Sequence, residues 1–127
     1  KLDCTIVRLS ATVKGVEHYP VCDEVPKVAA KPRVYVIGHP LGGGLSFSIA
    51  DNLLIDHVDP KIQYRAPTNP GSSGSPVFDS TWALLALHHA GHQAQMPKLD
   101  GSGLHAANEG LSFAAIVKQC QRDRRKA

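Results

Sequence analysis

The stretch Pro70–Pro76 constrains the fold of this chain more than any other. Its sequence, PGSSGSP, brackets three serines with two glycines and two prolines, directly before the apolar pair Val77-Phe78. Because glycine tolerates positive φ and close backbone approach, the pattern predicts a tight turn that leads into a strand. A serine hydroxyl would then lie beside unpaired backbone N–H groups, which can hold an oxyanion while the hydroxyl attacks a carbonyl. A plain Gly/Ser turn between two strands is the alternative interpretation.

Short apolar runs separated by turn residues fill most of the remaining chain. Short strands at near-regular spacing, with turn signals between them, are typical of an all-β barrel or sandwich. The run Ala114–Arg124 instead has helical spacing, and His92–Asn108 is predicted to form a long Gly/Ser-bearing loop. Strands are predicted at residues 2–9, 33–38, 45–50, 52–57, 62–66, 77–79, 82–91 and 111–113.

The charge pattern and the length of the apolar runs argue against two classes of partner. The 127 residues carry a formal net charge of +3, and much of the excess lies in residues 122–126. A nucleic-acid interface would spread basic residues over a face with interleaved aromatics, whereas a terminal basic cluster is typical of a solvated helix end. No apolar run approaches the ~20 residues that span a bilayer. We therefore expect neither a nucleic-acid nor a membrane partner.

Neither the cysteines nor the histidines show the spacing of metal ligands. The three cysteines are far apart, which is typical neither of a disulfide framework nor of a zinc site. Three of the seven histidines lie within five residues, but H-H-x-x-H is not a recognised ligand spacing and no HExxH carboxylate accompanies it. We therefore expect no metal and no cofactor. The residues concerned are Cys4, Cys22, Cys120, His88, His89 and His92.

The serine turn resembles a known nucleophile motif. The order Gly71-x-Ser73-Gly74-x-Pro76 is similar to GDSGGP of the trypsin- and chymotrypsin-like serine peptidases. The resemblance implies that Ser73 is the nucleophile and that the backbone N–H groups of Gly71 and Ser73 form the oxyanion hole. Ser72 stands where many relatives carry Asp or Asn, so the activation-pocket salt bridge of trypsin itself is not implied.

A second motif concerns the triad aspartate. The string DCTIVRL, which begins at Asp3, resembles the segment that carries this aspartate in trypsin-like peptidases. The resemblance implies that Asp3 orients the catalytic histidine and stabilises its charged form. In the family the histidine comes first, then the aspartate, then the serine, which places the histidine upstream of Lys1. A capping or surface aspartate is the alternative interpretation.

A third motif concerns substrate specificity. The run Leu84–Gly91 is similar to the IGIHxGG strand of glutamyl endopeptidases and of picornavirus-type chymotrypsin-like proteases. The resemblance implies that His88 lies in the S1 pocket opposite Thr68, and the hypothesis is cleavage after Glu or Gln, since buried donors reject apolar side chains. A core histidine bonded to a backbone carbonyl is the alternative for His88. His89, next along the strand, is expected to point to the other face.

Together these motifs resemble a serine endopeptidase of the bacterial glutamyl-endopeptidase branch. They imply an all-β, chymotrypsin-like Greek-key barrel with a short C-terminal helix, the second barrel of a two-barrel enzyme. Residues 1–10 would be the last strand of the N-terminal barrel, residues 11–31 the connection, and residues 32–127 the C-terminal barrel and helix. The substrate would be a protein or peptide, hydrolysed through an acyl-enzyme.

Two other interpretations stay open. Without its histidine the chain would be inactive, so it could also be a non-catalytic fragment or pseudopeptidase that binds peptides or proteins. A viral chymotrypsin-like protease shares the pattern of Thr68 and His88. In each case half of a two-barrel fold would expose an apolar face, so the expected partners are the N-terminal barrel of the same parent protein or a second copy.

Overall fold

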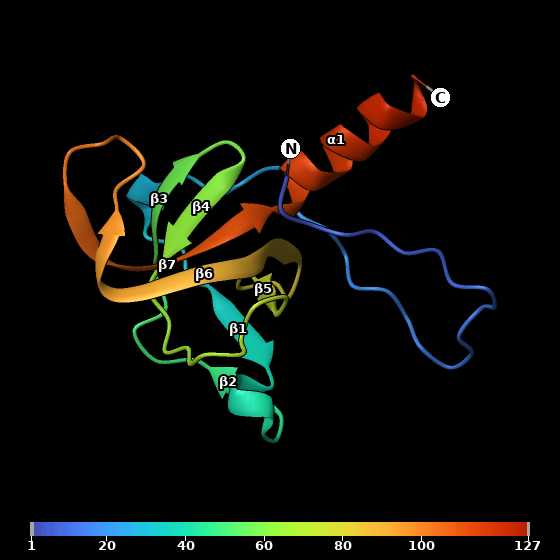
Figure 1. Cartoon of the computed structure of the whole chain (residues 1–127), viewed down its shortest axis with the longest axis horizontal. Coiled ribbons are helices and arrows are strands. Elements are labelled where there is room, and N and C mark those ends of the chain that lie inside the picture. Colours follow the sequence, from blue (N-terminus) through green and yellow to red (C-terminus); the bar gives the residue numbers. More distant parts are fainter. Residues whose placement is uncertain (1, 127) are drawn as a thin grey trace.

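The computed structural model describes residues 2–126, except for the side chains of residues 92–94. Within this range seven antiparallel strands form one sheet, and a single α-helix follows them. Figure 1 shows the strands wrapped around one interior, with the helix projecting from it. The elements are η1 (Val28–Ala30), β1 (Tyr35–Gly38), η2 (Pro40–Gly42), β2 (Ser46–Ser48), β3 (Leu54–Val58), β4 (Lys61–Tyr64), β5 (Pro76–Phe78), β6 (Leu84–Pro97), β7 (Leu104–Ser112) and α1 (Phe113–Arg124).

The sheet closes on itself as a barrel. Its strand order is β2-β1-β5-β6-β7-β4-β3, so the two end strands, β2 and β3, follow each other in the chain. The chain just before β1 also pairs with the chain just before β3, because the Val34 N–H donates to Asn52 O at 3.0 Å. This contact links the β2-β1 end of the sheet to its β3 end. An order in which β1 pairs with β5 and β4 pairs with β7 is that of a Greek key. These features confirm the predicted all-β, trypsin-like barrel with a short C-terminal helix.

Alternating apolar residues fill the barrel interior. Val34 and Val36 lie two residues apart, as do Ile62 and Tyr64, and side chains two apart share one face of a strand. All four are at most 3% exposed. Burying a side chain of this size contributes about 1.5–3 kcal/mol. The same core includes Leu54, Val77, Leu85 and Ala86.

The long hairpin of β6 and β7 corrects one prediction. Residues 92–108 do not form a loop, because β6 runs to Pro97 and β7 begins at Leu104. A tight turn joins them, in which the Lys98 N–H donates to Gly103 O at 2.9 Å. Both strands are this long because each pairs with the other. Pairing depends on the partner strand, so it does not appear as an apolar alternation in the local sequence.

The N-terminal segment corrects a second prediction. Residues 2–9 were expected as a strand, but no strand precedes β1 in the described chain. A strand requires a neighbour for its N–H and C=O groups, and the only bridge of this region joins Val21 to Leu84 among the described residues. Residues 5–20 are exposed throughout and form an extended arm, which Figure 1 shows projecting from the barrel. The division at residues 10 and 31 stays a prediction.

Helix α1 begins one residue before the predicted start. The Ser112 hydroxyl caps it by accepting from the Ala115 N–H at 3.2 Å, and Arg122 and Arg124 in the last turn favour its dipole. Only the first turns pack on the barrel, where Ala115 and Ile116 are buried. Among the described residues, no helix is both long and apolar enough to cross a membrane.

Candidate active site

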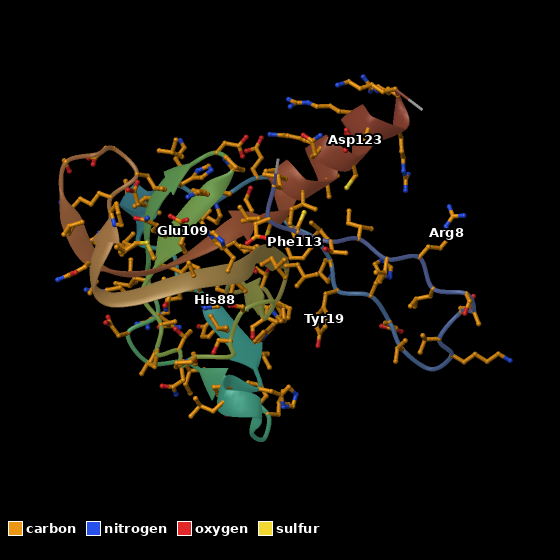
Figure 2. All side chains as sticks on the ribbon, in the orientation of Figure 1. Arg8, Tyr19, His88, Glu109, Phe113 and Asp123 are labelled. Carbon is orange, nitrogen blue, oxygen red and sulfur yellow. The ribbon has the colours of Figure 1, made fainter. Side chains whose placement is uncertain are left out.

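A cleft of about 1070 Å³ lies between the serine turn and strands β6 and β7. The structure brings four of the predicted site residues to its walls, namely Thr68, Gly71, Ser73 and His88. Asp3, the fifth, is not among the lining residues. Figure 2 shows His88 on the barrel and Arg8 well away from it on the N-terminal arm.

The serine turn is rigidly attached to β6. Gly71 and Gly74 adopt φ values of +89° and +86°, which only glycine takes up without strain. The Gly74 N–H donates to His88 O at 2.8 Å, and the His88 N–H donates to Ser75 O at 2.9 Å. These two hydrogen bonds fix the position of Ser73 relative to the strand that carries His88.

Three polar groups of the turn have no partner in the described chain. Ser73 is exposed, and its hydroxyl makes no hydrogen bond there. The backbone N–H groups of Gly71 and Ser73 are unpaired as well, whereas their neighbours Ser72, Gly74 and Ser75 all donate to backbone carbonyls. A hydroxyl and two free N–H donors in one turn are groups that acyl transfer can use.

His88 is a buried, neutral imidazole held by a tyrosine. Its Nδ1 lies 2.6 Å from the hydroxyl of Tyr64, so its partner is not a backbone carbonyl. Burial raises the pKa of Tyr64, which therefore keeps its proton and can donate it to Nδ1. In that tautomer the ring proton sits on Nε2, which has no partner in the described chain. Burial, and to a lesser degree the charge of His89, lowers the pKa of His88 to about 4.

Thr68 lines the cleft, and its hydroxyl proton is already used in a hydrogen bond within the protein. Its hydroxyl donates to Asn108 Oδ1 at 2.8 Å, and Asn108 Nδ2 donates to Ala66 O at 2.6 Å. The lone pairs of Thr68 Oγ1 therefore remain as acceptors. Gly91 is the neighbour of this pair, and a Cβ there would overlap Asn108 Oδ1. The sequence pattern assigned no role to Asn108, which it placed at the end of the predicted loop of residues 92–108.

A β-bulge separates His88 from His89. His88 pairs with Gly110 and Ala90 pairs with Glu109, so His89 is the extra residue of β6. His88 contacts Tyr64 in the interior, whereas His89 contacts Glu109 on the other face of the sheet, as expected. After the bulge the alternation of side chains between the two faces restarts. Gly91, rather than a residue with a larger side chain, therefore lies beside Asn108.

A buried carboxylate organises the face that carries His89. Glu109 is 5% exposed and lies 2.7 Å from Lys61 Nζ, 2.9 Å from Gln63 Nε2 and 2.9 Å from His89 Nε2. Burial alone would raise the pKa of Glu109, but these three donors outweigh it and the pKa lies below its ordinary value. His89 Nδ1 lies 3.6 Å from Asp3 Oδ2. Asp3 is thereby joined to the barrel through His89.

No histidine among the described side chains hydrogen-bonds to Ser73. Both nitrogens of His89 already face carboxylates, and Nδ1 of His88 faces Tyr64. The described residues contain no group of three metal-ligating side chains, and the side chain of His92 lies outside them.

Comparisons with known proteins identify the family of the chain. A family model described as a trypsin-like peptidase domain matches residues 1–87 of the 127. The chain is also similar to the uncharacterized protein y4fB of Sinorhizobium fredii, with 35% identity in an alignment of 63 residues that covers 44% of this chain and 10% of that protein. The chain thus spans about a tenth of the length of this curated relative. With most of its length matched by one family, the chain belongs to the trypsin-like peptidase domains.

Proposed function

We propose that this chain is the second barrel of a serine endopeptidase with Ser73 as its nucleophile. The observation that carries the proposal is the exposed Ser73 hydroxyl beside the unpaired N–H groups of Gly71 and Ser73, in a turn hydrogen-bonded to β6. A turn that served only to connect β4 and β5 would not require these donors to stay free. The family of the chain supports the same class of reaction.

The proposed reaction is acyl transfer. Ser73 Oγ attacks the carbonyl carbon of the scissile peptide bond, and a histidine supplied from upstream of Lys1 takes its proton. The N–H groups of Gly71 and Ser73 stabilise the oxyanion, and Asp3 orients the histidine. The histidine then protonates the leaving amine, and water hydrolyses the acyl-enzyme. None of these steps requires a metal or a cofactor.

The proposed specificity is for glutamine in preference to glutamate. The cleft presents one donor, Nε2–H of the neutral His88, and one acceptor, Oγ1 of Thr68, whose proton is held by Asn108. A carboxamide offers an acceptor and a donor that match both groups, whereas a carboxylate offers acceptors only. A substrate that leaves one buried polar group of the site unpaired is discriminated against. The choice between Glu and Gln left open by the motifs is therefore proposed as Gln.

Covalent labelling tests the nucleophile. A fluorophosphonate probe is added to the 127-residue chain and to a protein extended upstream of Lys1, and adducts are detected by intact mass. We expect no labelling of the short chain, single labelling of the extended protein, and none after Ser73→Ala. Ser80→Ala, which changes an exposed serine of another turn, is the matched control. An extended protein that contains the histidine and still does not react would contradict the proposal.

Paired peptides test the specificity. Two fluorogenic peptides that differ only in Gln or Glu at the cleaved position are compared in the extended protein. We expect kcat/KM to be higher for Gln, and the ratio to fall in Tyr64→Phe because nothing then holds the tautomer of His88. Equal rates for both peptides in the unchanged protein would contradict the assignment.

A second candidate function is peptide binding without cleavage. It is favoured by one observation, that no histidine of the described chain is paired with Ser73. A Gln-containing peptide that binds the extended protein and is never cleaved, while the fluorophosphonate leaves Ser73 unmodified, would support this candidate over the peptidase.

The proposed partner is an N-terminal barrel of the same parent protein. The arm exposes apolar side chains that a monomeric domain ordinarily buries, and so does the region of β2 around Phe47, which is 57% exposed. The arm residues concerned are Ile6, Val7, Leu9, Val13 and Val16. Without that barrel a second copy would cover this surface, so we expect the mass of the isolated chain in light scattering to rise with concentration. A monomer at every concentration would contradict the homodimer.

A further inference from the structure

We infer that His89 is the positioning residue for Asp3, which it ties to the barrel by standing between the carboxylates of Asp3 and Glu109. The inference deepens the proposed function, because it takes Asp3 as the acid that orients the catalytic histidine. It assigns a role to a residue that neither the nucleophile motif nor the specificity motif uses.

The bulge in β6 gives His89 its place. His88 and Ala90 occupy successive pairing positions, opposite Gly110 and Glu109, so the inserted residue stands over Glu109. An inserted residue bends the strand locally and re-aims a side chain. His88 therefore stays on the interior side of the strand, while His89 lies on the opposite face of the sheet.

Glu109 fixes the orientation of the His89 ring. The Glu109 carboxylate is buried and accepts from Lys61, Gln63 and His89 at 2.7–2.9 Å. Gln63 is itself fully buried and donates further to Pro97 O at 2.8 Å. A carboxylate held by three donors cannot turn away, so the imidazole that it accepts from has one orientation.

Asp3 depends on this imidazole. The Asp3 side chain is 85% exposed, and its interaction with His89 Nδ1 at 3.6 Å is the sole polar contact that the described chain gives it. Leu2 and Cys4 beside it are half-buried, whereas residues 5–20 are exposed. The segment thus touches the barrel over a few residues only, and it has no strand pairing to hold it. Figure 2 shows Arg8, a few residues on, already away from the barrel.

NMR of the 127-residue chain tests the anchor directly. We expect a nuclear Overhauser effect between the Asp3 β-protons and the His89 ring, and heteronuclear values for residues 2–4 close to those of the strands. In His89→Gln, which cannot stand between two carboxylates, the contact should vanish and the values for residues 2–4 should fall to those of the arm. His18→Gln, an exposed histidine of the arm, should change neither.

Glu109→Gln is the second variant, in case His89→Gln folds poorly. It keeps the shape of the side chain but removes the charge that holds the imidazole, so residues 2–4 should again loosen while the amide shifts of β1 and β5 stay unchanged. Residues 2–4 that keep their order in both folded variants would overturn the inference.

Labelling of Ser73 in the protein extended upstream distinguishes this inference from the proposed function. A displaced acid misorients the base, so His89→Gln should slow fluorophosphonate labelling by roughly tenfold or more. Loss of order at Asp3 with no labelling in any variant would refute the peptidase and leave the anchor standing. Loss of order with an unchanged labelling rate would refute the role of His89 in positioning the acid for catalysis.

Discussion

His88 makes the stability of the barrel sensitive to acid. Burial, with a smaller contribution from the charge of His89, lowers the pKa of His88 from its ordinary value of 6.5 to about 4. The unfolded chain therefore takes up a proton near pH 6.5, while the native state resists it down to about pH 4. Stability rises with pH wherever the unfolded state binds more protons, so it falls as the pH drops through this window. One pKa unit corresponds to about 1.4 kcal/mol, and the whole window to roughly 3 kcal/mol.

Urea unfolding between pH 4 and pH 7.5 measures this loss. Trp82, the single tryptophan, packs against Tyr35 and Phe78 and reports unfolding by fluorescence. The unchanged protein should lose roughly 3 kcal/mol more than His88→Gln between pH 7 and pH 4, because the variant has no imidazole to protonate and keeps the same carboxylates. His39→Gln, an exposed histidine, should behave like the unchanged protein. Equal losses in all three proteins would refute the reasoning.

Three further predictions concern single residues. Gly91→Ala should lower the free energy of unfolding in urea by roughly 1–3 kcal/mol, because its Cβ would push Asn108 out of place; an unchanged value would contradict the packing of the cleft. Gly71→Ala should lower it by about 1–2 kcal/mol, since this residue has a φ of +89°. Cys22 should be the last thiol to react with Ellman's reagent at pH 8, and only after urea is added, because burial and Asp79 raise its pKa to about 12; early reaction would contradict this.

The parts of the fold that short-range chemistry governs were predictable. The glycines of the serine turn adopt the positive φ that their spacing indicated, and Val34 and Val36 alternate as a buried strand should. A turn needs particular residues at particular places, and an apolar alternation needs one buried face, so both leave a local pattern. The barrel class follows from such patterns repeated along the chain.

The segment 2–9 and the hairpin of β6 and β7 were not predictable for the opposite reason. Residues 2–9 have strand-forming composition, yet no strand lies beside them in the described chain and they stay unpaired. Residues 104–109 have weak strand signals, yet β6 on one side and, from Asn108 on, β4 on the other make them a strand. Pairing energy comes from the partner, and the local sequence does not contain it.

The same division holds at the candidate site. The sequence by itself determined that Ser73 sits between two glycines in a tight turn and that His88 lies on an apolar strand. Only the tertiary structure decided that the Tyr64 hydroxyl meets Nδ1 of His88, and that His89 stands between Asp3 and Glu109. These contacts join residues far apart in the chain and depend on the register and the bulge of β6, which exist only once β7 has paired with it.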